Sequence, residues 1–280
     1  MVCAHPIMKS LTFLRVAAFA LAVGFQAALS AAAYQPKLGI QSWTLREMNF
    51  EQALEFASKH KLKYIQCTNK HIDPLAPLEE SLKQKAQLEA RGIQFYTFGV
   101  AGTSMNKEEN RKLFQFAKAM GIKLIIVEPR EAAQWDNLEE LVKEYDIKLG
   151  IHNHGLNSVY GHPDTVKKIL NARDARIGVC LDVGHVTGAG FDADKVFREY
   201  QGRVFDIHLK DKKIEQVDGK PTIVDVHIGS GSSNYAGLFE ELRKARWDGV
   251  LAIETDNPLY ARMPEEYVSR AIEFVKKHHP

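Results

Sequence analysis

The chain alternates regularly between two kinds of segment after Tyr34. Eight short runs are rich in β-branched and aromatic residues, a composition typical of strands. They are KLGIQSW, LKYIQCT, IQFYTFGV, IKLIIVEP, IKLGIHNH, IGVCLDVGH, VFDIHLKD and GVLAIETD. The segments between these runs repeat apolar residues with the period of an α-helix. Strands that alternate with helices form parallel sheets, because a parallel pair needs a long crossover connection.

Eight such units in 280 residues predict a closed (β/α)8 barrel, an α/β fold that takes roughly 250 residues. A doubly wound open sheet is the alternative. It is less favoured because no glycine-rich loop of the GxGxxG or Walker type follows any of the runs. We therefore expect a single TIM-barrel domain over residues 34–280. One excursion after the seventh strand should form a hairpin that turns at Asp218 and Gly219.

Local signals place several of the helix boundaries. Asn49 and Asn106 stand where each can cap a helix N-terminus, and Gly121 stands where the second of these helices should stop. Pro163 falls in the first turn of another helix.

Residues 1–33 differ in character from the rest of the chain. Lys9 and Arg15 precede an apolar run, VAAFALAVGFQAAL, and Ala31 and Ala33 then occupy the −3 and −1 positions of a cleavage site before Tyr34. The run is shorter than the roughly 20 apolar residues of a membrane span. We predict a signal peptide, secretion across the inner membrane into the periplasm and no stable membrane anchor. An uncleaved N-terminal anchor is the alternative.

The charge and cysteine content exclude some classes of partner. With 37 basic and 35 acidic residues, the chain lacks the cationic excess of a nucleic-acid-binding protein. Three cysteines do not make a disulfide framework, and we expect Cys67 and Cys180 to be free buried thiols. The sequence leaves the oligomeric state open.

Strand parity separates two sets of side chains in the last four strands. Alternate residues of a strand share a face. The large aliphatic residues fall on one face and should contact the helices. The small and ionisable residues fall on the other face and should point into the barrel; they are Gly150, His152, His154, Gly178, Cys180, Asp182, Asp206, His208, Lys210, Ala252, Glu254 and Asp256.

Ionisable residues end five consecutive strands. Those from the fourth strand to the eighth are Glu128, His152 with His154, Asp182, His208 and Glu254. The loops at the carboxyl ends of the strands build the active site of such barrels, so these side chains should converge. Carboxylates brought this close repel each other, and a divalent cation removes that repulsion. Mixed nitrogen and oxygen ligands suit manganese, cobalt, zinc or iron better than calcium, and magnesium is a further candidate.

The motifs GVCLDVGHVTGAG, DIHLKD and GVLAIET resemble those of the xylose isomerase-like TIM barrels, which include sugar (phosphate) isomerases and epimerases, inosose and dehydroshikimate dehydratases, and nucleases of the endonuclease IV type. The resemblance extends from Leu38 to the end of the chain. It implies a divalent metal held by four side chains, usually Glu, Asp, His and Glu. The last three correspond to Asp182, His208 and Glu254. His152 stands in place of the first glutamate, or Glu128 substitutes for it.

The resemblance also implies roles for other residues. Glu254 would act as a catalytic base, and His154 would be the second base, as in family dehydratases that have a histidine there. His185 and Lys210 match positions that hydrogen-bond substrate hydroxyls. By position alone, Trp43 at the end of the first strand is a candidate to stack on a sugar face, with a core or rim tryptophan as the alternative. Glu128, if it is not a ligand, is a candidate to bind substrate or to support a ligand.

These residues predict a metal-dependent sugar isomerase or epimerase that moves a proton next to a carbonyl, with an exported free sugar or sugar derivative as substrate. A lyase or dehydratase acting on a keto-sugar or cyclitol is the alternative, and the histidine at position 152 favours it. A nuclease is disfavoured by the near-neutral charge. A non-catalytic sugar-binding barrel is the remaining possibility.

Overall fold

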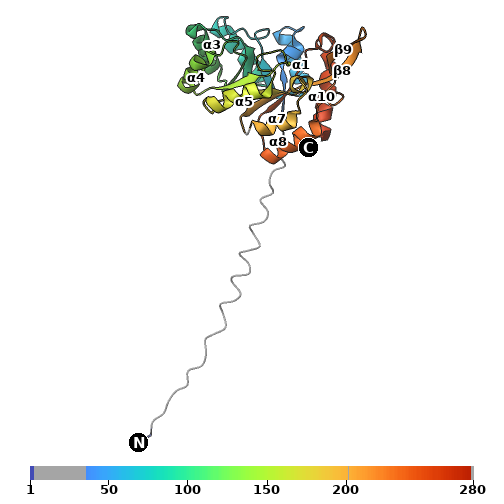
Figure 1. Cartoon of the computed structure of the whole chain (residues 1–280). Coiled ribbons are helices and arrows are strands. Elements are labelled where there is room, and N and C mark those ends of the chain that lie inside the picture. The colour runs from blue at the N-terminus through green and yellow to red at the C-terminus, as the bar shows by residue number, and fades with distance from the viewer. Residues whose placement is uncertain (3–35, 201, 279–280) are drawn as a thin grey trace. The chain divides into compact units, whose positions relative to one another are not determined.

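The computed structural model describes residues 1–2, 36–200 and 202–278, and those from 36 onward form one compact unit (Figure 1). The predicted signal peptide and its cleavage site lie almost entirely outside the described residues. Among the described residues, no helix combines the length and apolar character that crossing a membrane requires.

Eight parallel strands close into a barrel, which confirms the predicted (β/α)8 fold. Around the barrel the order is β1-β10-β7-β6-β5-β4-β3-β2, so each strand pairs with its neighbour in the chain apart from the inserted β8 and β9. The barrel strands are β1 (Lys37–Gln41), β2 (Tyr64–Cys67), β3 (Gln94–Ala101), β4 (Leu124–Val127), β5 (Lys148–His152), β6 (Ile177–Asp182), β7 (Val204–Leu209) and β10 (Val250–Ile253).

The helices surround the barrel, and three of them begin where the sequence predicts. Asn49 and Asn106 cap α1 and α3, Gly121 ends α3 with a φ of 72°, and Pro163 is in the first turn of α5. The helices are η1 (Ser42–Leu45), α1 (Phe50–Lys59), α2 (Leu78–Ala90), α3 (Lys107–Met120), α4 (Gln134–Tyr145), α5 (Pro163–Ala172), α6 (Val183–Gly188), α7 (Ala193–Glu199), α8 (Tyr235–Ala245), α9 (Pro258–Arg262) and α10 (Pro264–His278).

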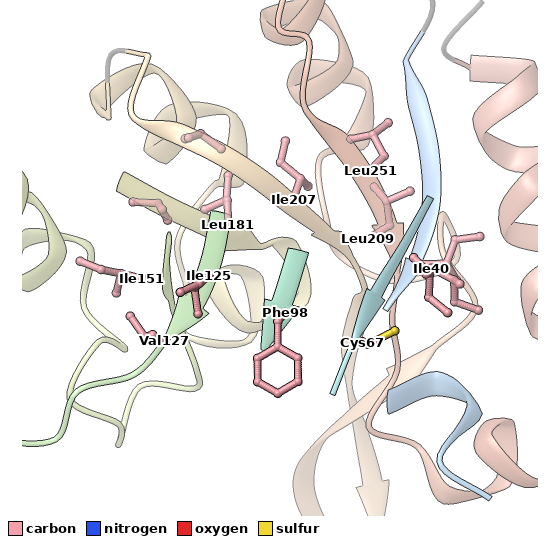
Figure 2. Close-up of a cluster of buried hydrophobic side chains, with 14 of the residues drawn as sticks. Ile40, Cys67, Phe98, Ile125, Val127, Ile151, Leu181, Ile207, Leu209 and Leu251 are labelled. Atoms are coloured by element: carbon pink, nitrogen blue, oxygen red, sulfur yellow. The ribbon is translucent and has the colours of Figure 1, made fainter. Parts of the chain in front are cut away.

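The core lies between the barrel and its helices. Figure 2 shows outward-facing strand residues such as Ile151, Leu181 and Leu209 among these buried side chains. Strand parity predicts that Phe205 shares the helix-facing side of β7 with Ile207 and Leu209, but it packs against Leu124, Ile126 and Cys180 instead. The reason is an irregularity in the pairing of β6 with β7, where the partner of Val179 is Val204 and the partner of Cys180 is Asp206. Phe205 therefore has no pairing partner in β6, and its side chain turns to the other face.

The excursion after β7 is a two-stranded antiparallel hairpin, as predicted. β8 (Asp211–Val217) and β9 (Lys220–Val226) pair only with each other and turn at Asp218 and Gly219, both with positive φ. The hairpin stands out from the body of the barrel in Figure 1. Because β8 begins two residues after the end of β7, its first residues lie beside the site described below. Cys67 and Cys180 are free and buried, as expected.

Candidate active site

Three buried side chains meet at the carboxyl ends of β5, β6 and β7. His152 Nε2 lies 3.2 Å from His208 Nδ1, and Asp182 Oδ2 lies 3.5 Å and 3.6 Å from these two nitrogens. The strand register produces this meeting, because His152 pairs with Cys180 while Asp182 pairs with His208. Asn153 fixes the junction: its amide donates to the Asp182 carbonyl and accepts from the Asp182 N–H.

Hydrogen bonds on the far side of each ring fix the tautomers of these two histidines. The side-chain N–H of Gln66 donates to the Gly99 carbonyl, so the Gln66 Oε1 faces His208. This oxygen accepts a hydrogen bond from the Nε2–H of His208 at 2.8 Å. Nδ1 of His208 therefore carries a lone pair. His152 Nδ1–H donates to Glu128 Oε1 at 2.6 Å, which leaves the His152 Nε2 lone pair for the centre.

The donor set fits a divalent cation. Two nitrogen lone pairs at 3.2 Å would repel each other, so either a proton or a cation must lie between them. The buried Asp182 Oδ2 has no hydrogen bond of regular geometry within the described residues, and its charge is met only by the nearby ammonium of Lys210 and the two imidazoles. A ligating histidine whose other nitrogen donates to a carboxylate is the usual arrangement at metal sites. Two imidazoles and one carboxylate are a donor set that would hold a catalytic divalent metal.

Glu128 joins both histidines of the fifth strand. Its Oε1 accepts from Nδ1 of His152 and also contacts Nδ1 of His154. The two rings lie edge to face, with centroids 4.6 Å apart. His152 is buried, whereas the His154 side chain is 42% exposed and faces the cavity. The two histidines thus share a carboxylate but differ in their access to substrate.

Lys210 organises the opposite side of the site. Its ammonium contacts Glu254 Oε2, Asp182 Oδ2 at 3.1 Å and Asp256 Oδ2 at 2.8 Å. His185 Nε2 lies 3.2 Å from the Lys210 Nζ and 3.3 Å from Asp256. Glu254, predicted as a ligand, is therefore held by Lys210, and it is absent from the group formed by His152, Asp182 and His208. Its role as a fourth ligand stays a prediction.

The hairpin supports this second side. Lys212 at the start of β8 forms an ion pair with Asp225 near the end of β9, and lies 3.6 Å from Asp256. Asp225 Oδ2 also accepts from the Asp256 N–H at 2.7 Å and from the Thr255 hydroxyl at 3.1 Å. The inserted strands thus fix the backbone that follows Glu254.

A cavity of about 280 Å³ opens above these groups. Six of the predicted residues line it: Trp43, His152, His154, His208, Lys210 and Glu254. Trp43 lies in η1 at the rim, 40% exposed, with the Arg46 guanidinium over its ring. Asp182, His185 and Glu128 do not belong to the lining among the described residues, but each contacts a residue that does.

Burial and charge shift the pKa values in opposite directions. Burial would lower the pKa of His152, but its bonds to Asp182 and Glu128 raise it to about 9. Burial lowers the pKa of His208 to about 4. Burial would raise the pKa of Glu128, yet the two histidines lower it to about 2. Burial raises the pKa of Glu254 to about 8, against the attraction of Lys210, which lowers it.

Several contributors were not predicted as site residues. Asp256 shares its parity with Glu254, and this signal could have identified it. Gln66 is a lone amide in an apolar strand, but only the folded structure shows that it fixes His208. Beneath the centre, Asp206 accepts from the Tyr96 hydroxyl at 3.0 Å, and burial raises its pKa to about 7.

Comparisons with known proteins agree with this architecture. Inosose dehydratase from Clostridium perfringens (strain 13 / Type A) is 26% identical over 292 residues, which cover 86% of this chain and 97% of that protein. The crystal structure of a zinc-bound IolI protein has a TM-score of 0.68 at 18% identity, covering 87% of this chain and 98% of that one. D-allulose 3-epimerase from Methylomonas sp. has a TM-score of 0.64 at 14% identity, covering 88% and 99%.

The family match includes every residue of the site from Glu128 to Asp256. The family model described as xylose isomerase-like TIM barrel aligns with residues 54–278. Together with the closed eight-stranded barrel, this match shows that the chain belongs to the xylose isomerase-like TIM barrel family.

Proposed function

We propose that this protein is a divalent-metal-dependent lyase that removes water from a keto-sugar or keto-cyclitol. One observation carries the proposal: the two sides of the cavity hold different chemistry, a histidine–carboxylate pair on one side and a carboxyl group with an ammonium on the other. Elimination needs one base for the C–H proton and one acid for the leaving oxygen, whereas reversible epimerisation needs two groups of similar basicity on opposite faces, each acting as base in one direction and as acid in the other. The likeness to inosose dehydratase supports the same choice.

His154 is the proposed base. Its Nδ1 faces the Glu128 carboxylate, so the other ring nitrogen is left for a substrate in the cavity that His154 lines. Glu128 orients the ring and stabilises the positive charge that the ring gains when it takes a proton. The proton removed is the one on carbon next to the substrate carbonyl.

Glu254 is the proposed acid. It lines the same cavity from β10, and burial raises its pKa, which favours the protonated form that an acid needs. Lys210 cannot neutralise Asp182, Asp256 and Glu254 together, and Glu254 is the one of the three whose pKa is raised. Glu254 would protonate the hydroxyl that leaves from the β-carbon.

His152, Asp182 and His208 would hold the metal. A bound divalent ion would polarise the substrate carbonyl and so acidify the neighbouring C–H bond. His154 then takes the proton, and the C–H electron pair becomes the new carbon–carbon double bond. The C–O bond breaks with its electrons on oxygen, Glu254 supplies the proton, and water leaves.

An isomerase or epimerase is the second candidate. Glu254 and His154 line one cavity, and on opposite faces of a substrate one of them could take a proton from carbon while the other returns a proton to it. D-allulose 3-epimerase shares the fold.

Product analysis separates the two. The metal-loaded protein is incubated with 2-keto-myo-inositol and with a panel of keto-hexoses in deuterated water, and products are followed by NMR. The lyase gives an unsaturated product with loss of water, and a chelator abolishes the reaction. A recovered isomer carrying deuterium, with no unsaturated product, would identify an epimerase instead.

We further propose that the substrate is an unphosphorylated sugar met outside the cytoplasm. The support is the sequence pattern of residues 1–33. N-terminal sequencing of the protein isolated from its host should begin at Tyr34. A protein that retains residues 1–33 would contradict cleavage.

A further inference from the structure

A second, larger cavity adjoins the catalytic one. It measures about 580 Å³ and shares two wall residues, Asn69 and Val100, with the catalytic cavity. It lies among the segments that follow β2 and β3, at the same end of the barrel as the catalytic groups. Ligand pockets usually measure roughly 300–1,000 Å³. At about 280 Å³ the catalytic cavity is slightly below that range, and the second cavity is well within it.

The lining of this second cavity combines apolar surface with unused polar groups. Leu75, Phe98 and Leu113 supply part of the apolar wall, and Leu75 is 83% exposed. Lys112, with its ammonium, and Asn69, with its side-chain amide, are also lining residues. Neither group makes a side-chain hydrogen bond or ion pair with the part of the chain that the structure describes. An apolar wall with free donors suits a ring that has one apolar face and polar substituents.

We propose that the second cavity is a subsite for a second ring, and that the substrate is an O-glycoside rather than a single-ring sugar. The ring that carries the ketone occupies the catalytic cavity between His154 and Glu254. The linking oxygen passes Asn69 and Val100, and the second ring lies against Leu75 and Leu113. This inference rests on the proposed function, because it takes the catalytic cavity as the place of the keto ring.

Gly102 offers a way to close the subsite without disturbing the site. It lines the second cavity but not the catalytic one, and a Cβ added there meets no atom within 4 Å. Its φ is outside the positive range that favours glycine. Gly102→Trp therefore places an indole in the open space of the subsite. Gly102→Ala makes the same backbone change without that bulk and is the matched control.

Equilibrium binding tests the proposal independently of turnover. The probes are methyl β-D-glucoside and phenyl β-D-glucoside, each oxidised to the 4-ketone, which leaves a hydroxyl on the β-carbon C2. They are titrated calorimetrically into the metal-loaded His154→Ala protein, which lacks the proposed base and therefore binds the probes without converting them. We expect the phenyl probe to bind at least about tenfold more tightly than the methyl probe. Gly102→Trp should erase this difference and leave the methyl probe unaffected, while Gly102→Ala should preserve it.

The outcomes separate this inference from the proposed function. Equal affinity of the two probes for the His154→Ala protein with Gly102 intact overturns the subsite and leaves the lyase proposal standing. A preference for phenyl that survives Gly102→Trp overturns its location in this cavity. Failure of both probes to bind contradicts the keto-sugar site itself, and the subsite falls with it.

Discussion

The two sides of the active site solve opposite electrostatic problems. On the histidine side, the single carboxylate of Glu128 contacts two imidazoles. On the lysine side, the single ammonium of Lys210 contacts three carboxylates. The first arrangement favours groups that accept protons, and the second leaves one carboxyl group that keeps a proton. A site with this asymmetry is suited to a reaction that needs a base and an acid at once.

Removing the lysine side's ammonium should have the largest effect on stability. Lys210→Met leaves Asp182, Glu254 and Asp256 close together without the cation that they share. Breaking a buried ion pair by deleting one partner costs about 3–5 kcal/mol, so the unfolding free energy should fall by that amount. Denaturant unfolding measures it.

Lys213 provides the matched control for this change. It lies on the hairpin with its side chain 41% exposed, and it pairs with Glu215. Lys213→Met should change the unfolding free energy by less than about 0.5 kcal/mol. Equal effects of the two substitutions would show that the contacts of Lys210 stabilise the fold no more than those of an exposed lysine.

The histidines should divide into one that holds metal and one that moves protons. His208→Ala removes a nitrogen from the metal group, so metal content should fall to near zero. His154→Ala should keep the metal and lose turnover by about 10²–10⁴-fold, the usual contribution of a general base. Metal analysis and turnover of both variants check this. A fully active His154→Ala protein would show that the base lies elsewhere.

Glu128 tests whether one carboxylate serves both histidines. Glu128→Gln keeps the shape but removes the charge that orients both rings. Loss of such a partner typically costs 10–100-fold in metal affinity or activity, and we expect both quantities to fall. If metal affinity alone changes, Glu128 supports only His152.

Metal affinity should also depend on pH, and the change per pH unit should be smaller than the changes caused by the substitutions above. Because the pKa of His152 is about 9, its imidazole is protonated at neutral pH when the centre holds no metal. Binding must displace this proton, so the apparent affinity should rise by at most tenfold per pH unit up to about pH 9 and then level off. Titration of the apoprotein with zinc at several pH values measures this. An affinity that is independent of pH between 6 and 8 would contradict the proton competition.

The fold was more predictable than the site because strand period and helix caps are local signals. Asn49, Asn106 and Gly121 mark helix ends through their own side chains or backbone freedom, and the structure confirms all three. Parity also placed His152, Asp182 and His208 together. It was wrong for Phe205, because an irregularity in the β6–β7 pairing depends on both strands. The contacts of Glu128 and Lys210 depend on side chains that meet from the ends of five strands, which no local pattern specifies.

The distinct roles of the two sides can be tested most directly with Glu254→Gln. In deuterated water, with a keto-cyclitol substrate that the unmodified protein dehydrates, NMR follows both exchange of the proton next to the carbonyl and loss of water. If Glu254 is the acid and His154 the base, exchange should continue while loss of water falls by about 10²–10³-fold. If exchange and water loss fall together, Glu254 is the base and the assignment of the two sides is wrong.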